Sequence, residues 1–272
     1  MLGTPLRPMV KVAAMSFAAA DPALPPSSGI TERQVRVFYA RPEQWGGAAF
    51  AAAHSSLDAH ERARSERFVY EHDRKLYVVA HALLRHGLSV ASPGTAREAW
   101  RFKTEGKFGK PRLAEHGGPL RFSLSHTRGL AACSVVLGRE VGIDVEPRDR
   151  RPPLAGGILS PSELLLLKGL AADSKREAFF RRWTLKEAYA KALGLGLSMP
   201  FDRFSFDFGA SQVRCRDEVQ GSDVTDHRFQ SWLLERHCVG VAFAATPSCA
   251  LEVVESRVGP WESIECTPAD LR

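Results

Sequence analysis

The stretch Val141–Glu146 alternates apolar residues with small or acidic ones, which is the period of a strand with one buried face. Asp144 and Glu146 then share the opposite face, where two neighbouring negative charges raise each other's pKa and oppose folding. A divalent metal ion relieves this repulsion, and Mg²⁺ commonly takes one or two carboxylates together with substrate phosphates. Taken alone, the pair also fits two solvated acids at an exposed strand edge.

A second pair of ionisable residues lies in a helical pattern that runs from about residue 175 to 193 and stops at Gly194. Spacing by four places Trp183, Glu187 and Lys191 on one face of this helix. By itself, the Glu187–Lys191 spacing favours a simple ion pair, which contributes about 0.3–0.5 kcal/mol.

Three further polar groups are candidates for contact with an anion. Ser125 and His126 end a predicted strand over residues 120–127, and the sequence has no G-x-S-x-G elbow that would indicate a serine hydrolase. The turn at 106–111 brings backbone N–H groups and lysines together around Gly109 and Lys110, without the pattern of a P-loop. A charged hairpin loop is the alternative interpretation of this turn.

Arg74 is the third candidate, because it stands in the first turn of a predicted helix. A cation there opposes the helix dipole, and a bound anion would relieve that cost.

Composition limits the class of protein. The chain has 272 residues, 44% hydrophobic and 25% charged, which is typical of a globular protein, and no apolar run long enough to predict a membrane-spanning helix. The net charge of +6 predicts an anionic partner, which is a nucleic acid, a phosphorylated ligand or an acidic protein. Five scattered cysteines without a C-x-x-C pair argue against disulfides and zinc, and for a reducing cytosol.

The order of helix and strand patterns along the sequence predicts an α+β fold with two similar lobes, each of antiparallel sheet plus helices. A ligand site is expected in the cleft between the lobes. Two helices are expected within 57–88, the second capped by Asp73 and ending near Gly87, and a third begins at Ser160 with a capping box. The expected division is a flexible extension over 1–33, an N-terminal lobe over 34–147, a linker over 148–157, a C-terminal lobe over 158–253 and a tail over 254–272.

Three motifs in order carry a resemblance to a known family: Phe122–His126, Val141–Glu146 and Trp183–Lys191. Together they resemble the Sfp-type 4′-phosphopantetheinyl transferases, and the turn Gly109–Pro111 resembles the G-K-P turn of that family. The resemblance covers roughly residues 35–245. It implies a pseudo-twofold fold and an enzyme that moves the 4′-phosphopantetheine group of coenzyme A onto a serine of an acyl or peptidyl carrier protein, releasing 3′,5′-ADP.

The resemblance also implies roles for single residues. Glu187 and Lys191 would be catalytic, with Lys191 on the diphosphate. The other implied contacts are metal ligands at Asp144, Glu146 and Glu187, and coenzyme A contacts at Arg74, Gly109, Lys110, Ser125 and His126. The implied cofactor is Mg²⁺, with Mn²⁺ possible in its place. The carrier would serve polyketide, non-ribosomal peptide or fatty acid biosynthesis, and the enzyme would be a cytoplasmic monomer without nucleic acid or membrane partners.

Two other hypotheses stay open on the sequence alone. A nucleic-acid enzyme or binder fits the basic charge and the carboxylate pair, although the chain lacks a zinc-finger or RRM signature. A non-catalytic relative that docks carrier proteins is the other, and the intact carboxylates and Lys191 argue against it.

Overall fold

The structure is a computed structural model, and it describes residues 29–114, 118–152, 156–209, 212–245 and 252–261. Residues 1–28 of the predicted extension (1–33) and residues 262–272 of the predicted tail (254–272) lie outside the described residues.

The first sheet has the strand order β12-β1-β5-β4, in which β12 runs parallel to β1 and the other neighbours are antiparallel. Its strands are β1 (Gln34–Ala40), β4 (Leu120–Thr127), β5 (Leu130–Leu137) and β12 (Glu252–Arg257). The helices beside it are α1 (Gly47–Ser56), α2 (Ala59–Ser65) and α3 (Glu71–Ala91), of which α3 packs on the sheet. A hairpin of β2 (Phe102–Glu105) and β3 (Lys110–Leu113) precedes β4.

The second sheet has the order β6-β11-β10-β8-β7, with β9 paired to β8. Its strands are β6 (Val141–Pro147), β7 (Phe204–Phe208), β8 (Val213–Asp217), β9 (Ser222–Asp223), β10 (His227–Leu234) and β11 (His237–Ala244). The helices on this side are α4 (Pro161–Lys168) and α5 (Ala172–Leu193), and α5 covers β6 and β11. Short 3₁₀ turns lie at Pro42–Gln44, Arg97–Ala99, Gly196–Ser198 and Phe201–Arg203.

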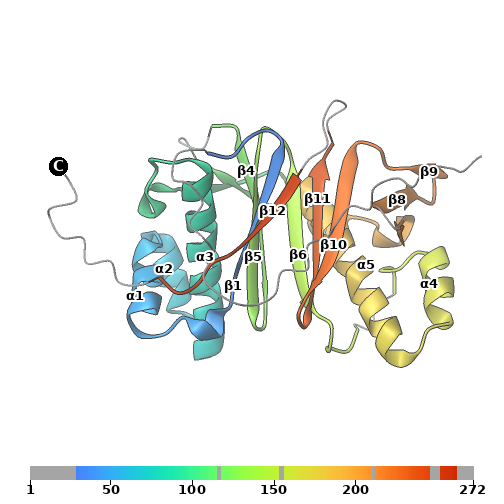
Figure 1. Cartoon of the computed structure of the whole chain (residues 1–272), viewed down its shortest axis with the longest axis horizontal. Coiled ribbons are helices and arrows are strands. Elements are labelled where there is room, and N and C mark those ends of the chain that lie inside the picture. The colour runs from blue at the N-terminus through green and yellow to red at the C-terminus, as the bar shows by residue number, and fades with distance from the viewer. Residues whose placement is uncertain (1–28, 115–117, 153–155, 210–211, 246–251, 262–272) are drawn as a thin grey trace, which may run out of the picture.

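The two sheets pack against each other through an apolar layer, with α3 and α5 on the outer faces (Figure 1). Val37 and Val136 of the first sheet and Ile143 and Val241 of the second are all fully buried in this layer. The expected α+β architecture of two halves is therefore confirmed, and the halves meet through a solid core rather than an open cleft.

Local sequence signals explain the ends of the helices on the second side. Ser160 accepts a hydrogen bond from the Glu163 N–H, and Glu163 returns one to the Ser160 N–H, so the predicted capping box is confirmed. Helix α5 ends at Gly194, whose φ of +70° is left-handed and favours glycine. The strand predicted from alternation at Val141–Glu146 is β6, and its apolar residues are buried as expected.

Several expectations differ from the structure. Strand β6 pairs with β11 in the second sheet, although the sequence division placed it in the N-terminal lobe. Residues Glu252–Arg257 form β12 rather than a tail, because they complete the edge of the first sheet beside β1. Ile30 packs into the core, so the end of the predicted extension is ordered. The domain boundaries themselves stay predictions.

Helix α3 also differs, since it continues through Gly87 to Ala91 and Asp73 lies inside its first turn. Gly87 does not end the helix. It lets α3 approach the first sheet, because a Cβ at Gly87 would lie 2.8 Å from the Phe38 ring.

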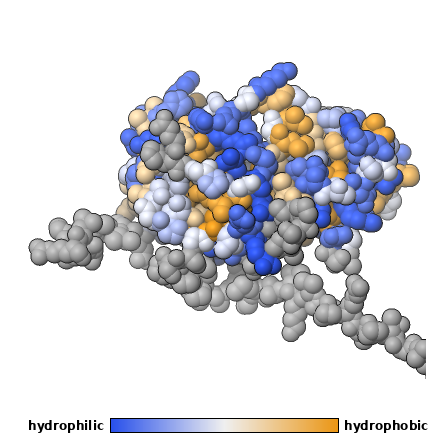
Figure 2. Space-filling view, turned by 90° about the horizontal axis from the view of Figure 1, so that it is seen from above, coloured by the Kyte–Doolittle hydropathy of each residue, from blue (hydrophilic) through white to orange (hydrophobic). Residues whose placement is uncertain are grey.

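Seen from above, hydrophilic residues run across the middle of the molecule, between more apolar patches on either side (Figure 2). Among the helices of the described residues, none is both long and apolar enough to cross a membrane.

Candidate active site

The candidate site lies at the seam where β4 of the first sheet meets β6 of the second. Each strand is the edge of its own sheet. Side chains of β4 bridge the seam: Ser123 Oγ accepts a hydrogen bond from the Ile143 N–H at 3.1 Å, and Ser125 Oγ donates to Asp144 Oδ1 at 2.8 Å. The first sheet thereby fixes the position of the Asp144 carboxylate.

Helix α5 brings the second half of the site against β6. Lys191 Nζ donates to Asp144 Oδ1 at 2.7 Å and to the Ile143 carbonyl at 3.1 Å, and Trp183 Nε1 donates to Glu146 Oε1 at 3.2 Å. The predicted face of Trp183, Glu187 and Lys191 thus points at the acidic face of β6. Among the described residues, Lys191 forms its ion pair with Asp144 and not with Glu187. The interpretation of Glu187 and Lys191 as a simple ion pair within the helix is therefore wrong.

The three carboxylates affect one another's ionisation. Burial and the charge of Asp144 raise the pKa of Glu187 to about 7, against the opposing charge of Lys191. Burial and the charge of Asp144 also raise the pKa of Glu146. Asp144, Glu146 and Glu187 therefore lie close enough for their charges to interact, and added positive charge near them would be favourable.

The donor set fits a hard divalent cation in its chemistry. Asp144 is 6% exposed, and its Oδ2 is buried without a hydrogen-bond donor among the described residues. Such an orphaned carboxylate oxygen is costly unless a ligand satisfies it. In this conformation Arg150 pairs with Glu146 Oε2 at 3.2 Å, and within the described ranges no three His, Cys, Asp or Glu side chains are arranged to hold a metal.

Positive charge gathers around His126 at the end of β4. Although part of the residue is exposed, crowding by the protein and then the charges of His81, Lys191 and Arg64 lower the pKa of His126 to about 4. The imidazole is therefore neutral at neutral pH, and Arg64 of α2 and Lys191 of α5 add positive charge near it. An anion at this position would be held from both lobes.

A buried network behind this cluster holds His81 in place. His81 Nδ1 lies 2.8 Å from Glu61 Oε1, and Arg85, which is fully buried, donates through Nε to Glu61 Oε2 at 3.1 Å. Although burial alone would raise it, the hydrogen bond and charge of His81 and the charge of Arg85 lower the pKa of Glu61 to about 2. The contact with Glu61 thus fixes the orientation of the His81 ring near His126.

Arg74, one of the predicted coenzyme A contacts, has no contact with the residues of the seam among the contacts described. Arg74 lies on α3 seven residues before His81, hence on the same helix face, and its guanidinium stands over the Phe50 ring at 5.9 Å. Its Nε is buried and without an acceptor in the described part of the chain. The role of Arg74 toward an anion stays a prediction.

Lys110 is held by the C-terminal end of α5. Its Nζ pairs with Glu140 Oε2 at 2.6 Å and donates to the Ala192 carbonyl at 2.8 Å. Gly109, beside it, has a φ of +66° that favours glycine. These contacts attach the β2–β3 hairpin to the second lobe, and the nucleotide role predicted for Gly109 and Lys110 stays a prediction.

Sequence reasoning did not single out Ser123, His81 and Glu61. The signal for His81 was its spacing from Arg74, which places both on one face of α3. Ser123 alternates with Ser125 along β4, so both face β6. The capping box of Asp58 and Glu61 at the start of α2 was readable, but its pairing with His81 and Arg85 depends on the packing of α2 against α3.

A cavity of about 420 Å³ adjoins the carboxylates, and Glu146, Trp183 and Phe201 contribute to its wall. Trp183 and Phe201 pack edge to face, with ring centroids 5.4 Å apart. This cavity offers an apolar approach to the acidic face of β6.

Comparisons with known proteins point to one family. A family model described as the 4′-phosphopantetheinyl transferase superfamily matches residues 140–242. The 4′-phosphopantetheinyl transferase HetI of Nostoc sp. is 37% identical over 154 residues, which are 53% of this chain and 62% of HetI. A 4′-phosphopantetheinyl transferase of Bacillus subtilis is 27% identical over 165 residues, 60% of this chain and 69% of the relative. The match to HetI thus spans less than two thirds of that protein.

A solved structure, the holo-[acyl-carrier-protein] synthase of Thermotoga maritima, is 27% identical and covers 39% of this chain and 62% of its own, with a TM-score of 0.31.

Proposed function

We propose that the chain is a member of the 4′-phosphopantetheinyl transferase superfamily, whose family model matches residues 140–242, and that it transfers the 4′-phosphopantetheine group of coenzyme A to a serine of an acyl or peptidyl carrier protein. The observation that carries the proposal is the meeting, at the β4–β6 seam, of the orphaned Asp144 carboxylate with Lys191 and the cationic cluster around His126. The proposed reaction requires a site for a cation beside a site for an anion, and these residues supply the charges for both.

Phosphoryl transfer depends on charge neutralisation and alignment more than on covalent help from the protein. Lys191, which already reaches Asp144, is positioned to bind a diphosphate oxygen and stabilise the charge of departing 3′,5′-ADP. His126, with Arg64 and His81 nearby, would hold another phosphate of coenzyme A. The nucleophile is the serine of the carrier, whose proton Glu187 would accept, directly or through water.

Asp144, Glu146 and Glu187 would hold Mg²⁺, or Mn²⁺ in its place, and the ion would neutralise charge on the diphosphate. In this conformation Lys191 pairs with Asp144 and Arg150 pairs with Glu146. We also propose that the enzyme is a cytoplasmic monomer. Its carrier would be acidic, because a net charge of +6 favours an acidic partner.

The test is intact-mass spectrometry of an apo carrier protein incubated with this protein, coenzyme A and Mg²⁺. The expected result is a carrier heavier by one phosphopantetheine group, with the gain abolished by EDTA. Acyl, polyketide and peptidyl carriers are tested in parallel. No gain on any of them, with the protein folded and coenzyme A bound, would refute the proposed acceptor; no binding of coenzyme A would refute the proposed substrate.

A matched pair of variants separates the site from general loss of charge. Asp144→Asn should abolish transfer, because it weakens the orphaned cation ligand. Asp223→Asn on β9 removes a carboxylate that is half exposed and paired with Arg216, and should leave transfer unchanged. Equal activity of both variants would remove Asp144 from the site.

A further inference from the structure

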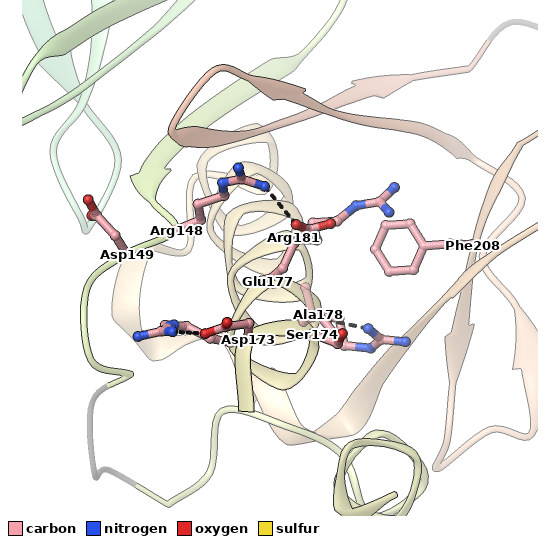
Figure 3. A pocket seen from close by; sticks show the side chains of 10 residues that line it. Arg148, Asp149, Asp173, Ser174, Glu177, Ala178, Arg181 and Phe208 are labelled. Atoms are coloured by element: carbon pink, nitrogen blue, oxygen red, sulfur yellow. Dashed lines mark hydrogen bonds and ion pairs between the residues drawn. The ribbon is translucent and has the colours of Figure 1, made fainter. Parts of the chain in front are cut away.

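A cavity of about 510 Å³ lies at the N-terminal half of α5, apart from the site just described. Figure 3 shows Arg148 and Asp149 on one side, residues of α5 along the middle and the Phe208 ring on the other side. Glu177, in this cavity, precedes Glu187 by ten residues on α5, or about 15 Å at 1.5 Å per residue. The cavity is therefore a separate feature of the second lobe.

The acidic residues of this cavity are already paired. Glu177 Oε2 accepts a hydrogen bond from Arg148 at 2.9 Å, and Asp173 forms an ion pair with Arg176 (Figure 3). Asp149 pairs in turn with an arginine outside the cavity, Arg236. Among the described residues, these ion pairs leave two arginines of the cavity without one of its own carboxylates as a partner.

Those remaining arginines are Arg181 and Arg182. Each has a buried Nε without a hydrogen-bond acceptor among the residues that the structure describes. Arg182 is only 5% exposed, and its Nη1 donates to the Ala178 carbonyl of its own helix at 3.0 Å. Both residues line the cavity, and each keeps one N–H for which the described residues offer no hydrogen-bond acceptor.

The carboxylate near Arg182 is shared with another buried cation. Glu163 Oε1 lies 3.6 Å from Arg182 Nε, while Glu163 Oε2 pairs with fully buried Lys186 at 2.8 Å. One negative charge thus serves two buried positive charges, and burial lowers the pKa of Arg182 as expected for an undercompensated cation. An added anion would stabilise this arrangement.

Phe208 fixes the geometry of both guanidinium groups. The Arg181 and Arg182 guanidinium carbons lie 4.2 and 5.0 Å from the centroid of the Phe208 ring. Stacking on an aromatic ring orients a guanidinium group and leaves its N–H edges free, and those edges match the spacing of two oxygens on one phosphate or carboxylate.

We propose that this cavity binds a small oxyanion, a phosphate or a carboxylate group, through Arg181 and Arg182 with Phe208 as their support. The inference does not depend on the proposed transferase activity, because it uses none of the residues at the β4–β6 seam. The cavity volume leaves room for an organic part attached to the anionic group.

The test follows the arginine Nε–H signals of the full chain by NMR while inorganic phosphate, or acetate in a parallel titration, replaces chloride at constant ionic strength. Saturable shifts of the Arg181 and Arg182 signals, assigned by Arg181→Gln, are expected with at least one of the two anions. Tighter binding of phosphate would identify a phosphate site, and tighter binding of acetate a carboxylate site. Shifts that do not saturate with either anion would overturn the proposal.

Variants supply the second criterion. Arg181→Gln should raise the dissociation constant at least about tenfold, the loss expected for one hydrogen bond between charged groups. Phe208→Leu should weaken binding as well, and it serves if Arg181→Gln does not fold. The control is Arg257→Gln, an exposed arginine on β12 of the first sheet that donates to Gln44 and does not line the cavity. Equal affinity of wild type and both cavity variants would also overturn the proposal.

Discussion

At Gly142, both the packing of the second lobe and the candidate site depend on the absence of a side chain. A Cβ built on Gly142 lies 2.6 Å from the Ala192 amide nitrogen and overlaps the carbonyl oxygen of Ala188. These are backbone atoms of α5, so no side-chain rotation can relieve the contact. Bringing the Ala192 nitrogen alone to an ordinary 3.4 Å requires a shift of about 0.8 Å.

Gly142→Ala should therefore push α5 away from β6. Overpacking of a buried contact costs about 1–3 kcal/mol, and the rigid partners on both sides place this substitution in the upper half of that range. For a chain of this size, a loss of about 2–3 kcal/mol lowers Tm by roughly 4–12 °C. The same shift separates Lys191 from Asp144, now 2.7 Å apart, and a misplacement of about 1 Å can reduce a catalysed rate about 100-fold.

The assay pairs thermal unfolding, followed by circular dichroism, with the carrier-modification assay. The matched control is Gly169→Ala at the end of α4, where φ is −83° and an added Cβ meets nothing within 4 Å. Gly169→Ala should leave both Tm and transfer unchanged. If Gly142→Ala unfolds at the temperature of the wild type, the close approach of α5 to β6 is wrong. If only Tm falls and transfer persists at full rate, the dependence of the site on that approach is wrong.

Two further predictions concern charges on either side of the seam. Lys191→Met should lower the turnover of carrier modification, measured by steady-state kinetics, more than the affinity for coenzyme A, measured by calorimetry. The control is Lys168→Met at the end of α4, which should change neither quantity. A loss of affinity alone would refute a leaving-group role for Lys191. Glu61→Gln should destabilise the protein by about 3 kcal/mol at pH 7, from the depression of its pKa to about 2. Because this pKa lies below the unfolded value, the contribution of Glu61 is nearly complete above about pH 4.5 and is lost as the pH falls through 2. Urea unfolding should therefore show the difference between wild type and variant shrinking by about half between pH 7 and pH 3; a constant difference would contradict the ion pairing of Glu61 with His81 and Arg85.

The parts of the site that sequence predicted well are those set by local spacing. The four-residue repeat of Trp183, Glu187 and Lys191 determines one face of α5, and the alternation at Asp144 and Glu146 determines one face of β6. A helix end at glycine is also local, since only the backbone of Gly194 must turn left-handed. These features are set by local sequence and do not depend on which distant segments pack against them.

The parts that sequence did not predict depend on partners distant in the chain. The alternation of β6 shows that it is a strand, but its pairing with β11 brings together residues almost a hundred positions apart. Strand β12 joins β1 from the other end of the described chain. The charge of Lys110 was evident, but its partners, Glu140 and the Ala192 carbonyl, come together only when the β2–β3 hairpin packs on α5.

The seam itself shows why polar residues stand where two sheets meet. An edge strand carries unpaired N–H and C=O groups, and an exposed edge invites pairing with other chains. Here β4 and β6, each the edge of its sheet, lie together, and the links observed between them in the described residues run through Ser123 to Ile143 and through Ser125 to Asp144. Side chains rather than a regular backbone ladder join the lobes at this line, so a carboxylate can be held there with one oxygen free. The residues that close the edges of the sheets are thereby the ones that create the candidate site.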